Sequence, residues 1–329
     1  MLTYLLRRVF YTLPIILGVM LLTFFLFFMV SSPENVARKQ LGKNPSPELI
    51  QNWLKTHGYD KAQFINLPFD PKYKPDQPWY ESQFTNHMRA TLLFQFGQSD
   101  VNGEDISQRL LEGAGPSALI TLPAFIMTLL VTVSLSLVIA LYRGSYLDWG
   151  GMFICVLLMS LPIMVYIIAG QWLLGLVLRY FPVFGFAEGG DSLRFVLLPV
   201  VIGVLVGLGS SVRFYRTVML DEIGQDYTRT ARAKGLSERV VLFKHVLKNA
   251  LIPILTNVVA DLPLLILGSL LLENFFGIPG LGNLTVFAIT ELDFSLLRAL
   301  VFLGSLLYIV GLLLTDISYI LVDPRVRLE

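Results

Sequence analysis

The sequence predicts an all-α polytopic membrane protein, and three observations support this fold class. The mean hydropathy is +0.66, and charged residues make up 15% of the 329 residues, whereas soluble domains carry roughly 25%. The apolar residues gather in long runs, and about 20 helical residues suffice to cross ~30 Å of hydrocarbon. Backbone groups in lipid must be hydrogen-bonded internally, so these runs are expected to be helices rather than open strands.

Six apolar runs approach or exceed the length of a membrane-spanning helix. The expected spans cover residues 9–30, 119–142, 149–178, 195–212, 251–272 and 297–321. The third run contains Pro162, where we expect a tilt or kink. Arg7 and Arg8 precede the first run, as they would in a cleaved signal peptide. That run is longer than the roughly 7–15-residue core of a signal peptide, and no A-x-A-like cleavage site follows at once, so we expect it to be retained.

The basic residues predict which side of the membrane each loop faces. Arg143 follows the second run, a basic stretch at 213–248 follows the fourth, and Arg325 and Arg327 follow the sixth. With the N-terminal arginines, these segments lie on one side if the six helices alternate, and they hold about half of the 25 basic residues. Cytoplasmic loops carry an excess of Lys and Arg. We therefore expect a multi-pass membrane protein with both termini in the cytoplasm.

These assignments divide the chain into three parts. Residues 1–30 comprise the cytoplasmic N-terminus and the first span, and residues 31–115 form a polar, extracytoplasmic (periplasmic) insertion between the first two helices. Residues 116–329 form the core with the other five spans, including a cytoplasmic loop at about 213–250. Within the insertion, Ser46 followed by Pro47 predicts a short helix through Lys55. A spacer and a docking surface for an external partner are both compatible with its length.

Several functional classes are disfavoured by what the sequence lacks. The net charge of +1 gives no electrostatic case for binding nucleic acid. There is no GxxxxGK(S/T) phosphate loop, so ATP binding of that kind is not expected on this chain. There is also no HExxH motif, and His57, His87 and His245 lie outside the predicted spans, which disfavours a membrane-embedded protease. Cys155 lies in an apolar run and is interpreted as a packed hydrophobic residue. We expect no cofactor, metal or catalytic site.

Two acidic residues are candidates for a translocation path. Asp261 lies near the middle of the fifth run, where an ionised group costs about 2.5–3.5 kcal/mol. It either faces a pore and contacts the amino terminus of a substrate, or it is a buried acid that is neutral or hydrogen-bonded to a partner subunit. Glu273 lies at the outer end of the same run, as part of an outer gate or as an ordinary interfacial acid. A stand-alone ion-coupled carrier is a further alternative, because such carriers often place acids at mid-membrane.

The segment between the fourth and fifth runs predicts two helices separated by a sharp turn. Asp226 is placed to cap a short helix over residues 227–234, and Gly235 follows where the chain must enter the left-handed conformation. Ser237 is placed to cap a second, amphipathic helix. The expected apolar stripe of this helix is Val240, Phe243, Leu247 and Leu251, and the polar stripe is Lys244, His245 and Lys248.

A short exposed helix with small residues can approach a groove on another protein closely. The candidate docking residues are Tyr227, Arg229, Thr230, Ala231, Arg232, Ala233, Lys234 and Gly235. The alternative is a solvated basic loop that satisfies the charge rule for cytoplasmic segments. That alternative does not by itself account for the paired caps and the glycine, so docking is favoured.

This loop resembles that of the membrane permeases of ATP-binding-cassette (ABC) importers. Their signature is Glu-Ala-Ala, three residues, then Gly. The corresponding positions here hold Arg229, Thr230, Ala231 and Gly235, so the Glu and the first Ala are not matched. The departures resemble the B-type subunits of the oligopeptide and dipeptide permeases. Patches that resemble this subfamily in order and spacing are LLRR at 5–8, GYDK at 58–61, FGQS at 96–99, FPVFG at 181–185, YTRTARAKGLS at 227–237, NALIP at 249–253, IPGLG at 278–282 and DISYILVDPR at 316–325.

The resemblance implies a type I importer fold in a bacterial inner membrane. It also implies a transmembrane subunit, embedded in membrane lipid, that forms half of a translocation pore for peptides. It implies four further chains: a second homologous permease, two ATPases that bind ATP and Mg, and an extracytoplasmic peptide-binding protein. The short helix around Ala231 and Gly235 would dock on an ATPase, and ATP hydrolysis would take place on partner chains. Within this class the cargo stays open among dipeptides, longer peptides, antimicrobial peptides, nickel complexes and glutathione-like compounds.

Overall fold

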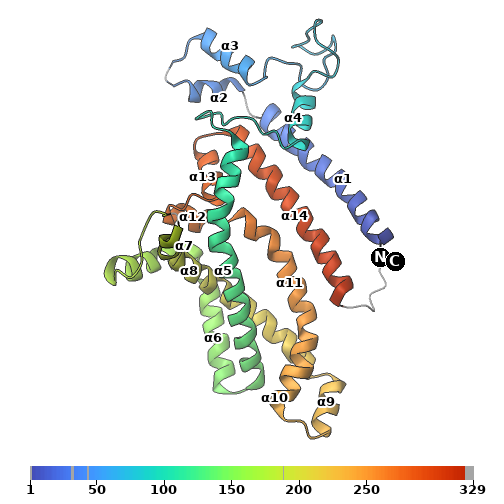
Figure 1. Ribbon diagram of the computed structural model, residues 1–329, viewed down its shortest axis with the longest axis vertical. Coiled ribbons are helices and arrows are strands. Elements are labelled where there is room, and N and C mark those ends of the chain that lie inside the picture. The colour runs from blue at the N-terminus through green and yellow to red at the C-terminus, as the bar shows by residue number, and fades with distance from the viewer. Residues whose placement is uncertain (1, 31–32, 43, 188, 323–329) are drawn as a thin grey trace. The chain divides into compact units, whose positions relative to one another are not determined.

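The computed structural model describes residues 2–30, 33–42, 44–187 and 189–322. Within these ranges the regular elements are helices, apart from one isolated antiparallel bridge between Gln98 and Asp105, and Figure 1 labels them. The predicted all-α fold is therefore confirmed. The chain divides into two compact units: unit 1 contains residues 1–112 and 284–306, and unit 2 contains residues 113–283 and 307–329. Arg325 and Arg327, which the charge rule used, lie outside the described residues.

Unit 1 contains several short helices around the N-terminal one. α1 (Leu2–Phe24) passes into a π-helical stretch, η1 (Phe25–Val30), and the unit also holds α2 (Pro33–Gln40), α3 (Pro47–Thr56) and α4 (Gln83–Leu92). The helix predicted after Ser46 is α3. The Ser46 hydroxyl accepts a hydrogen bond from the Leu49 N–H at 3.3 Å, which satisfies one of the unpaired donors of the first turn.

An aromatic cluster forms part of the core of unit 1. The Phe24 ring stacks on Phe28 and meets Phe64 and Phe84 in edge-on contacts. His87 of α4 packs into the same cluster, with its Nε2 3.3 Å from the Thr23 hydroxyl. Burial, and secondarily the positive charge of Arg298, lowers the pKa of His87 to about 4. The imidazole is therefore held neutral at pH 7.

The irregular parts of the 31–115 insertion are ordered by buried side-chain amides. The Asn66 amide donates to the carbonyl oxygens of Lys74 and Gln77 at 2.8 and 2.9 Å, and its Oδ1 accepts from the Lys74 N–H at 2.9 Å. Gln83 donates to the carbonyl oxygens of Tyr59 and Lys61 at 3.2 and 2.7 Å. These bonds satisfy backbone groups that are not paired in a sheet, so side chains order the described parts of the insertion.

Unit 2 contains most of the longer helices. Its elements are α5 (Ile106–Leu141), α6 (Tyr146–Ser160), α7 (Ile163–Gly170), η2 (Gln171–Val177), η3 (Gly189–Asp191), α8 (Ser192–Ile223), α9 (Asp226–Ala233), α10 (Glu238–Val240), η4 (Val241–Val246), α11 (Leu247–Leu267) and α12 (Leu270–Phe276). The first residues of α5 belong to unit 1, and α13 (Leu281–Thr290) and α14 (Phe294–Val322) contribute residues to both units.

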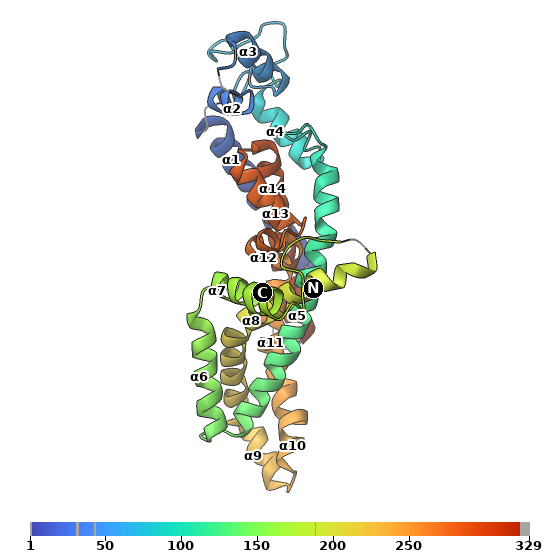
Figure 2. The same cartoon turned by 90° about the vertical axis from the view of Figure 1, so that its left-hand side faces the viewer.

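The packing of α6 along α8 organises one side of unit 2 (Figure 2). Arg216 of α8 donates two hydrogen bonds to the Asp148 carboxylate of α6 at 2.7 and 2.8 Å, a bidentate pair of the strong type. Cys155 is buried in an apolar cluster with Ile139 and Val212. This is the packed, unpaired role expected for the cysteine.

Among the residues that the structure describes, four helices are long and apolar enough to cross a membrane: Phe10–Phe28, Ile106–Leu141, Gly189–Ile223 and Phe294–Ile317. The number rises to six if each of two bent helix pairs counts as one span. One pair, Tyr146–Ser160 with Ile163–Val177, bends by 92° at a break that contains Pro162. Proline lacks the N–H of a helical residue and clashes with the preceding turn, so the break falls where the sequence predicted a kink. The other pair is Leu270–Phe276 with Leu281–Thr290.

Two predicted spans have different limits in the structure. The run at 195–212 is the middle of α8, which continues to Ile223 through residues that were expected to form a loop. The run at 251–272 is not one helix, because α11 ends at Leu267 and α12 begins at Leu270. Gly268 lies between them with a φ of 75°, a left-handed conformation that interrupts a helix. Glu273 therefore belongs to a separate helix and is not at the end of the fifth span.

The buried neutral His87 is expected to make the stability of unit 1 depend on pH. The pKa of histidine is roughly 6.5 in an unfolded chain and about 4 here. The stabilisation is complete above pH 6.5 and is lost as the pH falls toward 4. Lowering the pH from 7 to 5 should reduce the free energy of unfolding by about 2 kcal/mol through this group. The melting temperatures of the wild type and His87→Gln at pH 7 and pH 5 check this. If the melting temperature falls by the same amount in both proteins when the pH is lowered, the prediction is contradicted.

Candidate functional site

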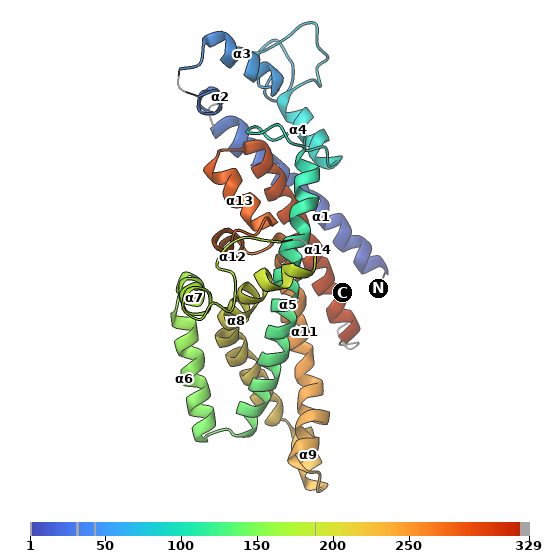
Figure 3. The same cartoon turned by 60° about the vertical axis from the view of Figure 1, so that its left-hand side comes forward.

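The predicted docking segment folds as a helical hairpin, called hairpin 226–246 below, which consists of α9, a turn, α10 and η4. It lies at the end of unit 2 where α8 stops and α11 begins (Figures 1 and 3). Gly235 forms the turn with a φ of 76°, as the sequence predicted. Arg232 donates across this turn to the Glu238 carboxylate at 2.8 and 3.2 Å. The two arms of the hairpin are therefore linked on its exposed side.

The helix starts in the hairpin differ from the predicted ones. Asp226 is the first helical residue of α9 and not its cap, because Gln225 holds the N-cap position without a side-chain capping bond. Ser237 holds the N-cap of α10 as predicted, but its side chain also makes no capping bond. The start of α9 is secured instead by Thr228, a buried residue whose hydroxyl lies 2.7 Å from the Ile223 carbonyl oxygen. A second link to α8 is the Tyr227 hydroxyl, which donates to the Glu222 carboxylate.

Tyr227 is a half-buried group with a perturbed acidity. Burial, followed by the hydrogen bond to Glu222, raises the pKa of the Tyr227 phenol to about 12. The phenol therefore stays protonated at physiological pH and remains a donor. Its hydrogen bond to Glu222 links α9 to the end of α8.

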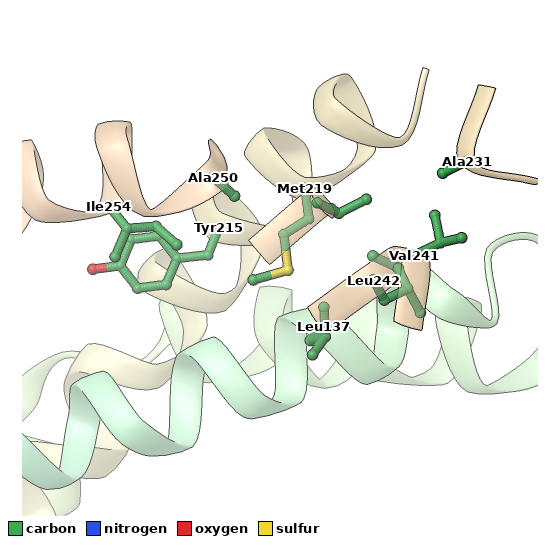
Figure 4. Packing of buried hydrophobic residues seen from close by; sticks show 10 residues of the cluster. Leu137, Tyr215, Met219, Ala231, Val241, Leu242, Ala250 and Ile254 are labelled. Carbon is green, nitrogen blue, oxygen red and sulfur yellow. The ribbon is translucent and has the colours of Figure 1, made fainter. Parts of the chain in front are cut away.

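A set of ten buried residues, called the hairpin core below, fixes the hairpin to three long helices (Figure 4). Its members come from α5, α8, α9, η4 and α11. They are Leu137, Ala140, Tyr215, Met219, Ala231, Val241, Leu242, Val246, Ala250 and Ile254. Packed interiors are as dense as organic crystals and transmit displacement rather than absorbing it. A displacement of α9 would therefore be passed on to α5, α8 and α11.

The apolar stripe expected for the second helix is wrong. Phe243, which was assigned to it, is 61% exposed, whereas Val241 and Val246 are fully buried. Residues 241–246 are π-helical, with i→i+5 hydrogen bonds, so the residues on one face no longer follow the 3.6-residue period used in the prediction. The side that packs against α5 and α8 is the one with Val241 and Val246, and Phe243 lies on the exposed side.

The predicted docking residues do not all face the same way. Ala231 is 4% exposed and belongs to the hairpin core, so it is not available to a partner. Tyr227 is half-buried. The exposed members of the set are Arg229, Thr230, Arg232, Ala233, Lys234 and Gly235. The outer surface of the hairpin therefore presents small side chains among basic ones.

Asp261 lies on α11, and it is exposed in the single chain. Asn257 precedes it by one helical turn and accepts a hydrogen bond from the Tyr215 hydroxyl at 3.2 Å. Asn257 was not among the residues predicted from the sequence, although its i, i+4 spacing from an acid in an apolar helix is a signal for it. The two residues give α11 a short polar stretch.

Glu273 is not the interfacial acid that one interpretation expected, because its side chain is fully buried in α12. Its Oε1 accepts from the Ser117 hydroxyl at 2.8 Å and the Ser269 N–H at 3.0 Å, and its Oε2 accepts from the Asn283 N–H at 3.0 Å. The Ser117 oxygen accepts in turn from the Leu281 N–H at 2.8 Å. A buried carboxylate requires such partners. This one ties α5 to the chain on both sides of α12.

Metal chemistry has no evident site in the described part of the chain. Its His, Cys, Asp and Glu side chains do not form a group of three or more that could hold a metal ion. The described features are a hairpin packed against long helices, a buried Glu273 side chain that accepts hydrogen bonds from the backbone around α12, and an exposed acid, Asp261, on α11.

Comparison with known proteins identifies the family. The family described as the binding-protein-dependent transport system inner membrane component matches residues 132–328, and its N-terminal region matches residues 1–68. A putative peptide transport system permease protein of Brucella abortus is 33% identical over 98% of both chains. The oligopeptide transport system permease protein of Bacillus subtilis is 30% identical over 99% of this chain and 100% of its own. The glutathione transport system permease protein of Salmonella typhi is 29% identical over 99% of each.

The chain therefore belongs to the family of binding-protein-dependent transport system inner membrane components. It is a multi-pass inner-membrane protein and a permease subunit of an ATP-driven importer rather than a stand-alone carrier or an enzyme. Subunits of this family have no cofactor of their own.

A methyl group at position 268 should test the pinning of α12. A Cβ on Gly268 would lie 1.9 Å from Glu273 Oε1 and 2.7 Å from the Ser117 oxygen, at a φ that L side chains rarely adopt. Gly268→Ala is therefore expected to destabilise the protein by about 3 kcal/mol or more. The melting temperature in detergent and the yield in the membrane measure the effect. Gly150→Ala is the matched control, because a Cβ there meets nothing within 4 Å, and equal behaviour of the two variants would contradict the role of the cluster.

Proposed function

We propose that this permease subunit forms half of a pore that carries peptides into the cytoplasm. The names of its relatives supply the cargo class, because they refer to peptides, oligopeptides and glutathione, which is itself a tripeptide. The single structural observation that carries the proposal is the hairpin core, which joins an exposed basic hairpin to α5, α8 and α11. Such a link is what a subunit needs if the energy for transport comes from another chain.

The assembly we propose contains a second homologous permease, two ATPases that hold ATP and Mg, and an extracytoplasmic peptide-binding protein. Both termini and the 213–250 segment face the cytoplasm. Residues 1–30 and 116–329 form the transmembrane part, and the 31–115 insertion faces outward, where the binding protein arrives. The insertion is folded by the buried amides of Asn66 and Gln83, which favours a defined surface over a flexible spacer.

In this proposal, hairpin 226–246 is the receiver of the ATPase motion. Its outer residues Arg229, Thr230 and Ala233 enter a groove on the ATPase, while Ala231 keeps the hairpin joined to the chain's own core. Closure of the ATPases displaces the hairpin as a rigid lever, and the connected helices switch the pore between outward and inward access.

The two acids have different roles in the proposed translocation path. Asp261 is exposed in the single chain and is assigned to the path, where it faces cargo or the second permease. Glu273 is surrounded by its own hydrogen-bond partners and is assigned to an outer gate, as the group that sets the positions of α12 and the following turn. Contact of Glu273 with cargo is not required.

A bulky residue on the outer face of the hairpin should uncouple the subunit without unfolding it. Ala233 is exposed, so Ala233→Trp is expected to leave the melting temperature unchanged and to reduce peptide uptake and stimulation of ATP hydrolysis at least roughly tenfold, because it blocks close approach to a groove. Reconstituted complexes in proteoliposomes provide both measurements.

Two further variants complete this test. Gln51→Trp places the same side chain on an exposed face of α3 and should leave coupling intact. Gly235→Trp changes the turn itself, where φ is 76°, and should uncouple as well. Intact assembly with unchanged uptake and ATPase stimulation in both hairpin variants would exclude the coupling role.

The charge of Asp261 should affect cargo that carries a positive charge. In the Asp261→Asn variant, uptake of a cationic peptide such as trilysine is expected to fall several-fold more than uptake of a neutral tripeptide, because only the Coulomb attraction is removed. Competition uptake with the two labelled peptides measures the ratio. An unchanged uptake of both peptides would remove Asp261 from the path.

A further inference from the structure

Unit 1 contains a cavity of about 180 Å³ that the transport role does not use. Its walls come from η1, the loop after α3, α4 and its following turn, and the first turns of α14. Polar amides and two imidazoles line it together with a few apolar groups. The polar members include Gln83, Asn86, Gln95, Ser295 and Arg298.

Arg298 is the only charged group of permanent sign among the residues that line this cavity. Its guanidinium lies 4.5 Å from the centre of the Phe28 ring and donates to the Ser295 hydroxyl at 2.8 Å through Nη2. Its Nη1 is buried and has no hydrogen-bond partner. A buried donor without an acceptor costs roughly 1–3 kcal/mol, and more when it is charged. The site is therefore short of one acceptor.

The nearby acids do not supply that acceptor. Asp100 accepts from the Ser295 N–H at 2.9 Å and the Ser295 hydroxyl at 2.7 Å, and His57 Nε2 lies 3.6 Å from its Oδ1. Asp293 accepts from the Leu296 N–H at 3.0 Å and from the Ser99 hydroxyl. Both carboxylates are thus engaged at the start of α14, and neither lines the cavity. Among the described residues, Arg298 forms no direct ion pair with an acid.

The size and charge of the cavity indicate a small ligand with one negative charge. An engineered cavity of about 150 Å³ holds benzene, so this one accommodates a group of about six to eight non-hydrogen atoms. One guanidinium matches one negative charge, and its planar fork fits a carboxylate in a bidentate manner. A doubly charged phosphate would meet a single cation with two carboxylates close by, which disfavours it. The amides of Gln83, Asn86 and Gln95 add donors and acceptors for an adjacent polar group.

We propose that this cavity binds the carboxylate of a small solute, with the Arg298 guanidinium as its anchor. In this complex a ligand oxygen becomes the missing acceptor of Nη1. A free α-carboxylate, as in an amino acid or at the end of a short peptide, has the right size and charge. The site is independent of hairpin 226–246 and of ATP.

The test measures binding to the purified full chain in nanodiscs, without ATPases or nucleotide, by isothermal titration calorimetry. The probes are acetate, glycylglycine, the C-terminal amide of glycylglycine, and inorganic phosphate. Acetate and glycylglycine should bind, and the amide should bind at least roughly tenfold more weakly, because it lacks the charge that Arg298 recognises. Phosphate should bind more weakly than acetate.

Variants locate the binding. Arg298→Gln should weaken glycylglycine binding roughly tenfold or more, and Arg298→Lys should be intermediate, since it keeps the charge and loses the fork. Arg89→Gln on the exposed side of α4 is the matched control and should leave binding unchanged. Because loss of Arg298 also disturbs packing on Phe28, Ala90→Leu provides a second approach: it fills the cavity and should abolish binding while leaving Arg298 in place and the melting temperature unchanged or higher.

Any one of four outcomes would overturn the proposal. These are the absence of acetate and glycylglycine binding to the wild type, equal affinity for glycylglycine and its amide, unaltered binding in Arg298→Gln or in Ala90→Leu, and tighter binding of phosphate than of acetate. Failure here leaves the coupling role intact, because uptake and ATPase stimulation by the Ala233→Trp and Gly235→Trp variants are measured separately.

Discussion

The packing of Val241, Leu242 and Val246 against α5 and α8 is the interaction on which the rest of unit 2 depends. These residues belong to a short π-helical stretch directly before α11. Through them, a polar, basic hairpin with little hydrophobic surface of its own is joined to three long helices. An isolated helix of eight residues such as α9 is not stable in water, so its order comes from this core, from Thr228 and from the bond between Tyr227 and Glu222. The same contacts that fold the hairpin would carry displacement in the coupling role proposed for it.

A second constraint concerns the places where helices break. Broken helices expose backbone groups that lipid cannot satisfy, and the chain resolves this with buried polar side chains. Ser117 and Glu273 serve the backbone around α12, where they bond the N–H groups of Ser269, Leu281 and Asn283. In unit 1, Asp293 plays the same part at the start of α14. Buried polar side chains in both units thus bond the backbone at these breaks, whereas Nη1 of Arg298 is one of several buried polar atoms without a hydrogen-bond partner.

The family membership and the physical analysis support each other at different levels. The match at residues 132–328 identifies the protein family. It does not show which surface of the hairpin is exposed. The burial of Ala231 divides the predicted docking set into an inner and an outer part, which resemblance alone could not do. The 31–115 insertion lies partly outside the two matched regions, and it contributes most of the cavity around Arg298.

Composition and local pattern were enough to establish a helical membrane protein, the break at Pro162, the start of α3 at Ser46 and the turn at Gly235, because each depends on hydrophobicity or on backbone conformation within a few residues. The sequence did not reveal which face of the second hairpin helix is buried, since a π-helical stretch changes the period and the partner helices choose the side. It also could not place Glu273, whose partner Ser117 is 156 residues away along the chain. Contacts between residues so far apart leave no local signature. Only the tertiary structure decided that this acid is a buried anchor, and that Arg298 keeps one donor free.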